Sequence, residues 1–361
     1  VAGHDKREAN SVVIHAQRIS GTGQLLWGNG GVPICQANGI QEYVQVVADG
    51  YGGAVMTWID GRNGTNNKDI YAQRVDSNGN VLWQINGVPI CTASGLQFNP
   101  YLISLGEHGV VITWYDKRSG NFDIYAQRIA LNGSVVWQTN GKPVCTAGGN
   151  QLVPQIISDS QNGAIITWED ERAGPLDENI YAQRIDQNGN VQWAMNGVAV
   201  CNAIHNQSKP HITSDAQNGA IITWYDMRNG DSDIYAQKIN SAGTPQWAHN
   251  GVAICTAPGS QTWGSGSNKS TIASDNQGGA IITWLDGNNY AYDVYAQRVD
   301  GSGAVQWQTN GVAICIAGGY QKRPSIIPGA AGAIIVWEDD RNKAASGTDV
   351  YIQRVTKSGK L

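Results

Sequence analysis

The chain has 361 residues, with 24 Lys or Arg against 29 Asp or Glu, which gives a formal net charge of −5. Nucleic-acid binding needs a basic face that neutralises phosphates, and attraction to a membrane surface needs a polybasic patch, so this composition argues against both. No apolar run approaches the ~18 residues of a membrane-spanning helix. No signal peptide opens the sequence at Val1, which suggests a mature or trimmed chain.

One pentapeptide, Ile-Tyr-Ala-Gln-Arg or a close variant, returns seven times along the chain. Its copies begin at residues 14, 70, 124, 180, 234, 294 and 350. A fixed period of this size is typical of propellers and solenoids. Because the same unit fills the chain, we expect one domain over residues 1–361 instead of the two or three that length alone suggests.

Each repeat is expected to form four short strands joined by tight turns. β-branched and aromatic residues mark the strands, and Gly-rich turns between them favour antiparallel hairpins. In the repeat at 98–145 the predicted strands cover residues 98–104, 110–114, 123–129 and 135–137. No 3.6-residue apolar period extends over ten residues, so helices should be minor.

Four antiparallel strands in about 55 residues indicate a propeller blade. The predicted fold class is therefore all-β, a six-bladed β-propeller of four-stranded antiparallel blades. The N-terminal hairpin at about 12–34 and the C-terminal strands would close the ring, which leaves one pentapeptide strand surplus. A seven-bladed propeller with one incomplete blade is the alternative. A β-helix is less favoured, because turns such as residues 76–79 suit hairpins.

Two tryptophans recur in each repeat, and a buried Trp removes ~150–250 Å² from water. We expect both sets to fill the faces where blades stack. One set is Trp58, Trp114, Trp168, Trp224, Trp284 and Trp337, and the other is Trp27, Trp83, Trp137, Trp193, Trp247 and Trp307. Trp263 lies outside the pattern.

Two motifs resemble known propeller repeats. Residues 76–83, echoed at 186–193 and 300–307, resemble the tryptophan-docking motif of quinoprotein-type propellers. They are also similar to the Asp-box of sialidase-like propellers, with the glycine shifted by one place. The phrase at 224–237 resembles repeats of secreted bacterial surface propellers. These resemblances imply a propeller fold and a secreted or cell-surface location.

A Trp-x-Asp-x-Arg motif recurs at the end of the second strand of the repeat. Alternate residues of a strand point the same way, so Asp and Arg can pair with each other or with the next blade. The alternative is a role in binding an anion or a sugar. The candidate pairs are Asp60 and Arg62, Asp116 and Arg118, Asp170 and Arg172, Asp226 and Arg228, and Asp339 and Arg341.

The six cysteines occupy the same place in different repeats. Packed sheets lie ~10 Å apart, whereas a disulfide needs Cα atoms within ~7 Å, so we expect six free, buried thiols. No Cys-x-x-Cys or Cys/His cluster indicates zinc. No cofactor is expected, although calcium could occupy the Asp-rich turns. The cysteines are Cys35, Cys91, Cys145, Cys201, Cys255 and Cys315.

Loops that depart from the period are the expected binding face, because function concentrates in variable loops on a rigid scaffold. Trp263, Tyr290 and Tyr292 are the candidate aromatic contacts there. The acids outside the repeat, Glu42, Glu107, Asp177 and Glu178, are dispersed along the sequence and suggest no pair of glycosidase carboxylates.

The sequence therefore predicts a non-catalytic binding or assembly module, with protein or glycan as its partner and no membrane insertion. A multivalent lectin and a sialidase-like glycoside hydrolase are the alternatives. A glycan array screen separates a lectin from a scaffold. The surplus terminal strand could also mediate self-association by β-augmentation.

Overall fold

The computed structural model describes residues 1–5, 13–263, 271–287 and 292–361. By internal contacts the chain divides into two compact units, the first comprising residues 1–166 and 183–197 and the second residues 167–182 and 198–361. Among the described residues, helical structure is limited to a 3₁₀ turn at Gly106–His108 and the short helix α1 (Lys343–Ser346). No helix in this part of the chain is long and apolar enough to cross a membrane.

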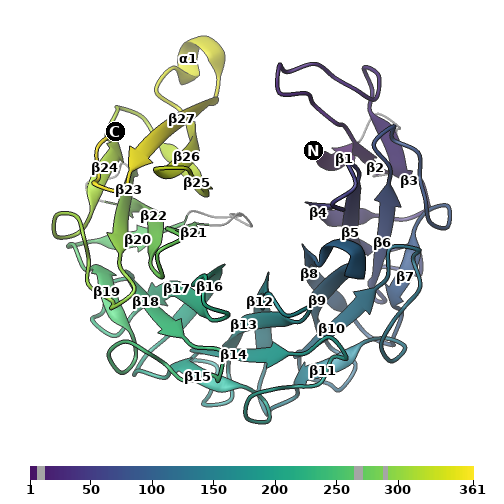
Figure 1. Cartoon of the computed structure of the whole chain (residues 1–361), viewed down its shortest axis with the longest axis horizontal. Coiled ribbons are helices and arrows are strands. Elements are labelled where there is room, and N and C mark those ends of the chain that lie inside the picture. The colour runs from purple at the N-terminus through teal and green to yellow at the C-terminus, as the bar shows by residue number, and fades with distance from the viewer. Residues whose placement is uncertain (6–12, 264–270, 288–291) are drawn as a thin grey trace. The chain divides into compact units, whose positions relative to one another are not determined.

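The first unit contains three complete antiparallel sheets (Figure 1). The first sheet orders β1 (Ala2–Asp5), β2 (Val13–Ala16) and β3 (Val32–Cys35). The second orders β4 (Gln41–Ala48), β5 (Ala54–Asp60), β6 (Asp69–Val75) and β7 (Val88–Cys91). The third orders β8 (Gln97–Ser104), β9 (Val110–Asp116), β10 (Asp123–Ile129) and β11 (Lys142–Cys145).

A fourth sheet orders β12 (Gln151–Ser158), β13 (Ala164–Asp170), β14 (Asn179–Ile185) and β15 (Val198–Cys201), and the division between the units falls within it. The second unit continues with β16 (Gln207–Ser214), β17 (Ala220–Asp226), β18 (Asp233–Ile239) and β19 (Val252–Cys255). The next sheet holds β20 (Ser260–Thr262), β21 (Ile272–Ser274), β22 (Ala280–Gly287), β23 (Asp293–Val299) and β24 (Val312–Cys315). The last orders β25 (Gln321–Gly329), β26 (Gly332–Asp339) and β27 (Asp349–Thr356).

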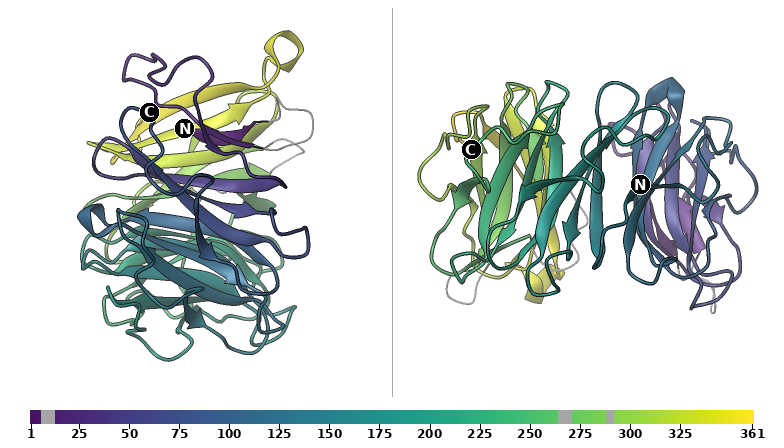
Figure 2. Two further views of the ribbon diagram at one scale, coloured as in Figure 1. Left: turned by 90° about the vertical axis from the view of Figure 1, so that its right-hand side faces the viewer. Right: turned by 90° about the horizontal axis from the view of Figure 1, so that it is seen from below.

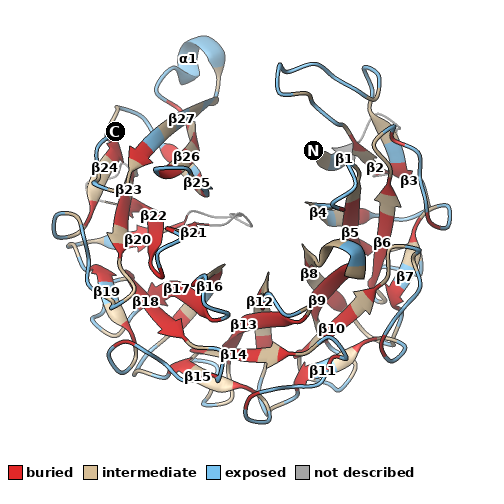
Figure 3. Cartoon of the chain, in the orientation of Figure 1, coloured by how far each residue is buried: buried red, intermediate tan, exposed pale blue. Residues whose placement is uncertain are grey.

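The second strand of each repeat forms the buried centre of its sheet. All seven residues of β17 are buried, and β18 pairs with it residue for residue from Ala220↔Ile239 to Asp226↔Asp233. β-branched side chains suit this pleated, doubly covered environment. Figure 3 shows these central strands in red and the exposed turns in blue. Within each unit, neighbouring sheets pack face to face (Figure 2).

Repeated antiparallel sheets confirm the predicted all-β propeller class. The described residues form seven sheets, which agrees with the alternative seven-bladed count and not with six. The seventh sheet arises because the last copy of the pentapeptide, on β27, pairs with β26, while the N-terminal hairpin β2–β3 pairs with β1. Each terminal pentapeptide strand thus has its own sheet, and none is surplus. Closure of the ring and the single domain over 1–361 stay predictions.

The fourth strand lies later in the repeat than the sequence suggests. Residues 135–137 make only the single bridge Ile129↔Val135, and β11 is the fourth strand. Asn140 and Gly141 both have positive φ, at 64° and 85°, so they form the tight turn that leads into β11. The β-branched residues at 135 and 136 therefore belong to the connection between strands.

The tryptophan that follows the third strand docks onto the next sheet. Trp83 Nε1 donates a hydrogen bond to Leu131 O at 2.9 Å. Gly133 (φ 86°) lies on the indole, and a Cβ atom there would be 2.9 Å from Trp83 Cγ. Trp247 docks in the same way, with its Nε1 3.1 Å from Gly301 O and Gly303 on its ring. These tryptophans join sheets, as predicted.

Candidate functional site

The repeated Asp-Arg pairs lie inside the sheets as structural ion pairs. Asp226 has no exposed surface, accepts a hydrogen bond from Trp224 Nε1 at 2.8 Å, and pairs with Arg228 at 2.5 Å. The Arg228 guanidinium lies over Tyr235, 4.1 Å from the ring centroid. The other four predicted pairs have the same ion pair, with distances of 2.5–2.7 Å. Each Asp therefore fixes a tryptophan and an arginine within its own repeat.

The six cysteines are free and buried, as predicted. Cys201 Sγ lies 3.2 Å from Arg228 Nη2, so the thiol packs against the repeated ion pair. Burial raises the pKa of Cys201 to about 12. A thiol in this environment stays protonated and acts as a small apolar side chain.

The aromatic residues proposed for the loop-rich face have different environments. Trp263 is only 1% exposed, with ring centroids 4.7 Å from Tyr225 and 5.5 Å from His211. It supports the surface from below and is not itself accessible. Tyr292 is 39% exposed. Tyr290 lies outside the described residues.

The middle residue of Trp-x-Asp varies between repeats, and in one of them it is a buried carboxylic acid. The six residues are Ile59, Tyr115, Glu169, Tyr225, Leu285 and Glu338. Glu169 ends β13 at 7% exposure, whereas the Glu338 side chain is 34% exposed and pairs with Arg323. No ion pair among the described residues is recorded for Glu169. The sequence signal that could have identified it is this departure from the repeat.

A bulge in β16 brings the backbone of Lys209 to Glu169. Lys209 N–H donates to Glu169 Oε1 at 2.5 Å. The register of β16 shifts between Ser208 and His211, and Lys209 has a φ of 51°. Pro210 follows and has no N–H for the ladder, which favours a bulge there. Positive φ in a residue other than glycine carries strain of a kind that clusters at functional sites.

The same bulge is present in other first strands. Equivalent residues with φ between 45° and 55° are Tyr43, Asn99, Val153 and Arg323. The backbone device is therefore repeated, while the side chain that it carries differs from sheet to sheet. In β16 that side chain is a lysine, whose ammonium lies 5.6 Å from the Tyr225 ring centroid.

The carboxyl group of Glu169 interacts electrostatically with two others, those of Glu171 and Glu178. Burial raises the pKa of Glu169 to about 7, the Lys209 N–H opposes this shift, and the charges of Glu178 and Glu171 add to it. Burial also raises the pKa of Glu178, and Glu171 contributes. Glu178, one of the acids outside the repeat, therefore contributes to the electrostatics of Glu169.

The other acids outside the repeat lie elsewhere. Glu42 pairs with Lys68 in the first unit. Glu107 is highly exposed beside His108. Asp177 lies in the loop that carries Glu178 and is half-buried. None of these three is recorded among the charges that shift the pKa of Glu169.

Two neutral groups lie behind the bulge. Burial lowers the pKa of His211 to about 4, and the charge of Lys209 contributes. Its Nδ1 accepts a hydrogen bond from the Thr271 N–H at 3.4 Å. Tyr225 shares a hydrogen bond with Thr262 at 2.8 Å, and burial raises the pKa of its phenol. Both groups stay uncharged at neutral pH, so the charged groups near Glu169 are Lys209, Glu171 and Glu178.

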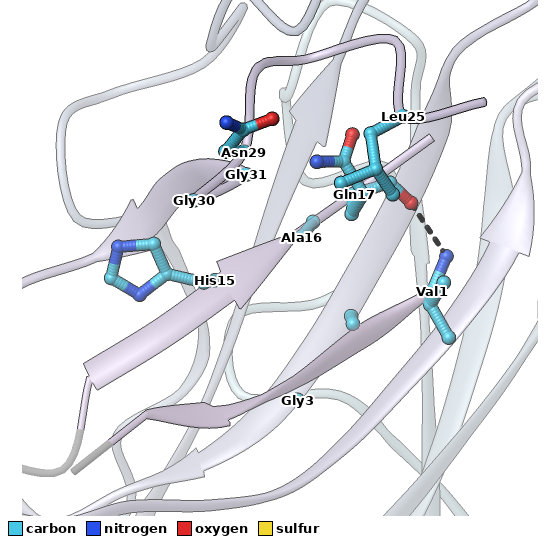
Figure 4. Close-up of a pocket in the computed structure, with 10 residues that line it drawn as sticks. Val1, Gly3, His15, Ala16, Gln17, Leu25, Asn29, Gly30 and Gly31 are labelled. Atoms are coloured by element: carbon cyan, nitrogen blue, oxygen red, sulfur yellow. Dashed lines mark hydrogen bonds between the residues drawn. The ribbon is translucent and has the colours of Figure 1, made fainter. Parts of the chain in front are cut away.

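Two of the hollows in the described structure are candidate binding sites, one in each unit. One of about 320 Å³ in the second unit has Thr262, Tyr292 and Tyr320 in its wall. Another of about 360 Å³ lies in the first unit, lined by β1, by β2 and by the segment that precedes β3, and there Val1 N donates to Gln17 O at 2.9 Å (Figure 4). The second hollow contains His15 but no carboxyl side chain, so it is the poorer candidate for acid catalysis.

Among the described residues, no group of three His, Cys, Asp or Glu side chains could hold a metal ion. In the turn that begins at Asp76, the carboxylate accepts the N–H groups of Asn78 and Asn80, each at 2.8 Å. The turn is thus stabilised by its own backbone. Calcium binding at such turns stays a prediction.

No family model matches the sequence, and no curated protein matches it at a significant level. Among solved structures, the chain is similar to polysaccharide lyase Uly1, with a TM-score of 0.54 and 10% identity over 96% of this chain and 85% of that chain. A PL25 ulvan lyase gives the same TM-score and identity, covering 96% and 87%. An α-L-arabinofuranosidase from Fusarium graminearum has a TM-score of 0.49, 12% identity, and coverage of 89% and 94%. At such identities the likeness shows a shared fold.

These comparisons correct the expectation of a non-catalytic binding or assembly module. The two structures with TM-scores above 0.5 are polysaccharide lyases, which are enzymes. The sequence favoured a non-catalytic role because the repeats are symmetric and the acids outside the repeat are dispersed, with a sialidase-like glycoside hydrolase as an alternative. Glu169 and its neighbours break that symmetry within the folded chain.

Proposed function

We propose that this protein cleaves a polysaccharide, with Glu169 as the general acid that protonates the departing glycosidic oxygen. The single observation that carries the proposal is the placement of Glu169. It is a buried carboxyl group at a position that other repeats fill with Ile, Tyr or Leu. It is held by a backbone N–H at a strained bulge.

A general acid works best when its pKa lies near the working pH. Burial and the neighbouring Glu178 and Glu171 keep a large fraction of Glu169 protonated near neutral pH. Glycoside hydrolysis uses a second carboxyl group, either as a base that activates water or as a nucleophile. Glu178 is the candidate for that role, because it is half-buried and interacts electrostatically with Glu169.

The neighbouring structures support a polysaccharide substrate through their fold, and the likeness of the Asp-turn repeats to the Asp-box of sialidase-like propellers agrees with it. A polysaccharide is too large to enter a cell intact, so we extend the proposal to a secreted or cell-surface location. The free thiols do not oppose this, because all six are buried.

The test is a cleavage assay over a panel of neutral, carboxylated and sulfated polysaccharides, with release of reducing ends as the readout. Glu169→Gln should lower the rate on the cleaved substrate by about 10²–10⁴-fold. Glu107→Gln, at an exposed acid in the 3₁₀ turn, is the matched control and should leave the rate unchanged. The proposal fails if Glu169→Gln retains the wild-type rate, or if the panel yields no product. If the products show the ultraviolet absorbance of an unsaturated sugar, the protein cleaves its substrate by elimination and not by hydrolysis.

A further inference from the structure

The hollow of about 320 Å³ in the second unit is joined to Glu169 by a continuous chain of contacts. Lys209 donates its N–H to Glu169 and places its ammonium over Tyr225. Tyr225 shares a hydrogen bond with Thr262, and Thr262 lines the hollow. These contacts link the residues around Glu169 to the wall of the hollow.

The wall of this hollow combines aromatic rings with cations. Tyr292 and Tyr320 are 39% and 48% exposed, and Leu285 forms its apolar floor at 2% exposure. The charged side chains that line it are Lys322 and Arg323, and no described carboxylate does so. Rings with one apolar face and a polar tip suit a sugar, which has C–H faces and hydroxyl edges.

The backbone fixes these walls in place. A Cβ atom at Gly287 would lie 2.9 Å from Tyr292 Cε1, so glycine is what lets the ring lie close to β22. The Gln321 N–H donates to Tyr292 O at 3.1 Å, which ties the loop to β25. Arg323 has a φ of 49° at the bulge of β25, the same device that presents Lys209 in β16. The recess is therefore largely formed before a ligand binds.

The two cations that line the recess each have a carboxylate partner outside its wall. Lys322 pairs with Asp340 at 2.5 Å, and Asp340 is shared with Lys343 at 3.4 Å. Arg323 pairs with Glu338 at 3.1 Å and is 51% exposed. Neither carboxylate lines the recess, so the charged side chains in its wall are the two cations. An arginine fork matches the planar oxygens of a carboxylate or the oxygens of a sulfate.

We infer that this recess is a binding subsite for a sugar unit that carries a carboxylate or sulfate group. The substrate class is therefore an acidic polysaccharide, with the anionic unit between Tyr292 and Tyr320 and its charge against Lys322 and Arg323. This inference rests on the proposed function for the chemistry at Glu169, but binding at the subsite needs no cleavage.

Isothermal titration calorimetry measures binding at the subsite independently of cleavage at Glu169. The protein used is the full chain carrying Glu169→Gln, so that ligands stay intact. The probes are trigalacturonate for carboxylate, a sulfated galactose trisaccharide for sulfate, and galactotriose as the neutral match. At least one anionic probe should bind about tenfold or more tightly than the neutral one, since hydrogen bonds to charged groups contribute that much or more.

The double variant Lys322→Gln with Arg323→Gln should abolish this preference, and added salt should weaken it in the parent protein. Lys343→Gln removes a cation from the same cluster that does not line the recess, and it should keep the preference. Both altered cations are substantially exposed, so folding should survive their loss. Equal affinity for all three probes, no binding of any probe, or a preference that persists in the double variant would overturn the subsite. Binding without cleavage by the wild type would overturn the proposed function alone.

Discussion

Asp170 and Glu169 are adjacent in β13, both buried and both acidic, yet their environments differ. Asp170 accepts hydrogen bonds from Trp168 Nε1 at 2.7 Å and from Arg172 Nη2 at 2.6 Å. Glu169 accepts a backbone N–H and lies near two further carboxyl groups. Asp170 therefore has two side-chain donors as partners, whereas burial and the neighbouring carboxyl groups raise the pKa of Glu169.

This difference distinguishes positions that recur across the repeats from positions at which one repeat departs from the others. Residues that recur, such as Asp170 and Arg172, satisfy one another within each sheet and build the frame. Residues that break the repeat, such as Glu169 and Lys209, carry charges that the frame does not neutralise. A stable repeat scaffold can tolerate one buried carboxyl group that lowers stability, and in this protein that group, Glu169, is the candidate for catalysis.

The largest expected effect comes from breaking the frame. Asp170→Ala should destabilise the protein by about 3–5 kcal/mol, because it leaves the Arg172 guanidinium and the Trp168 N–H without their shared partner. Denaturant unfolding measures this change. A loss below about 1 kcal/mol would show that the repeated pair is dispensable and would remove the contrast with Glu169.

Glu169 should make stability depend on pH in the opposite sense from a salt-bridged acid. Its folded-state pKa, about 7, is raised above that of the unfolded chain, so its effect is absent in acid and stability is lost as pH rises through about 7. Glu169→Gln should therefore match the wild type near pH 4. At pH 8 it should be more stable by on the order of 3 kcal/mol.

Unfolding curves of the two proteins at both pH values provide the measurement. A stability difference that does not change with pH would mean that Glu169 titrates normally. Asp170→Asn, which also removes an acidic group from β13, is the control and should destabilise the protein at both pH values.

Trp263→Phe should cost about 2 kcal/mol and also reduce activity. The indole Nε1 donates to Lys209 O at 3.1 Å, so the variant loses a buried hydrogen bond and some packing beneath the bulge. The Lys209 N–H should then hold Glu169 less firmly. Unfolding and cleavage rates measured on the same preparation check both effects, and a variant with reduced stability but full activity would separate the bulge from catalysis.

The smallest expected effect is a gain in stability. Lys238 Nζ lies 3.5 Å from Asp215, whereas the arginines at this position in other repeats lie 2.7–2.9 Å from their partners. Lys238→Arg restores the repeated residue and should stabilise the protein by up to about 1 kcal/mol without altering activity. A destabilised Lys238→Arg variant would show that the site has adapted to lysine.

The sequence predicted the frame well and the site poorly. The 54–60-residue period and the paired tryptophans were sufficient for the propeller class, and the identical placement of the cysteines was sufficient for free thiols. The fourth strand was misplaced because β-branched residues at 135 and 136 resemble a strand but make one bridge.

The site was missed for a different reason. Glu169, Glu178 and Lys209 lie within 41 consecutive residues of the sequence, but a loop and a bulge bring them together, and neither has a reliable sequence pattern. Trp263 was expected to contact ligand, yet burial makes it a support. The departure of Glu169 from its counterparts in other repeats is the sequence signal that could have pointed to this place.

The pH dependence of polysaccharide cleavage tests the central claim most directly. With Glu169 as the proton donor, kcat/KM of the wild type should fall above pH 7 with an apparent pKa of about 7, as the carboxyl group of the free enzyme ionises. A kcat/KM that stays constant from about pH 6 to pH 8 on a substrate that the protein cleaves would contradict the assignment.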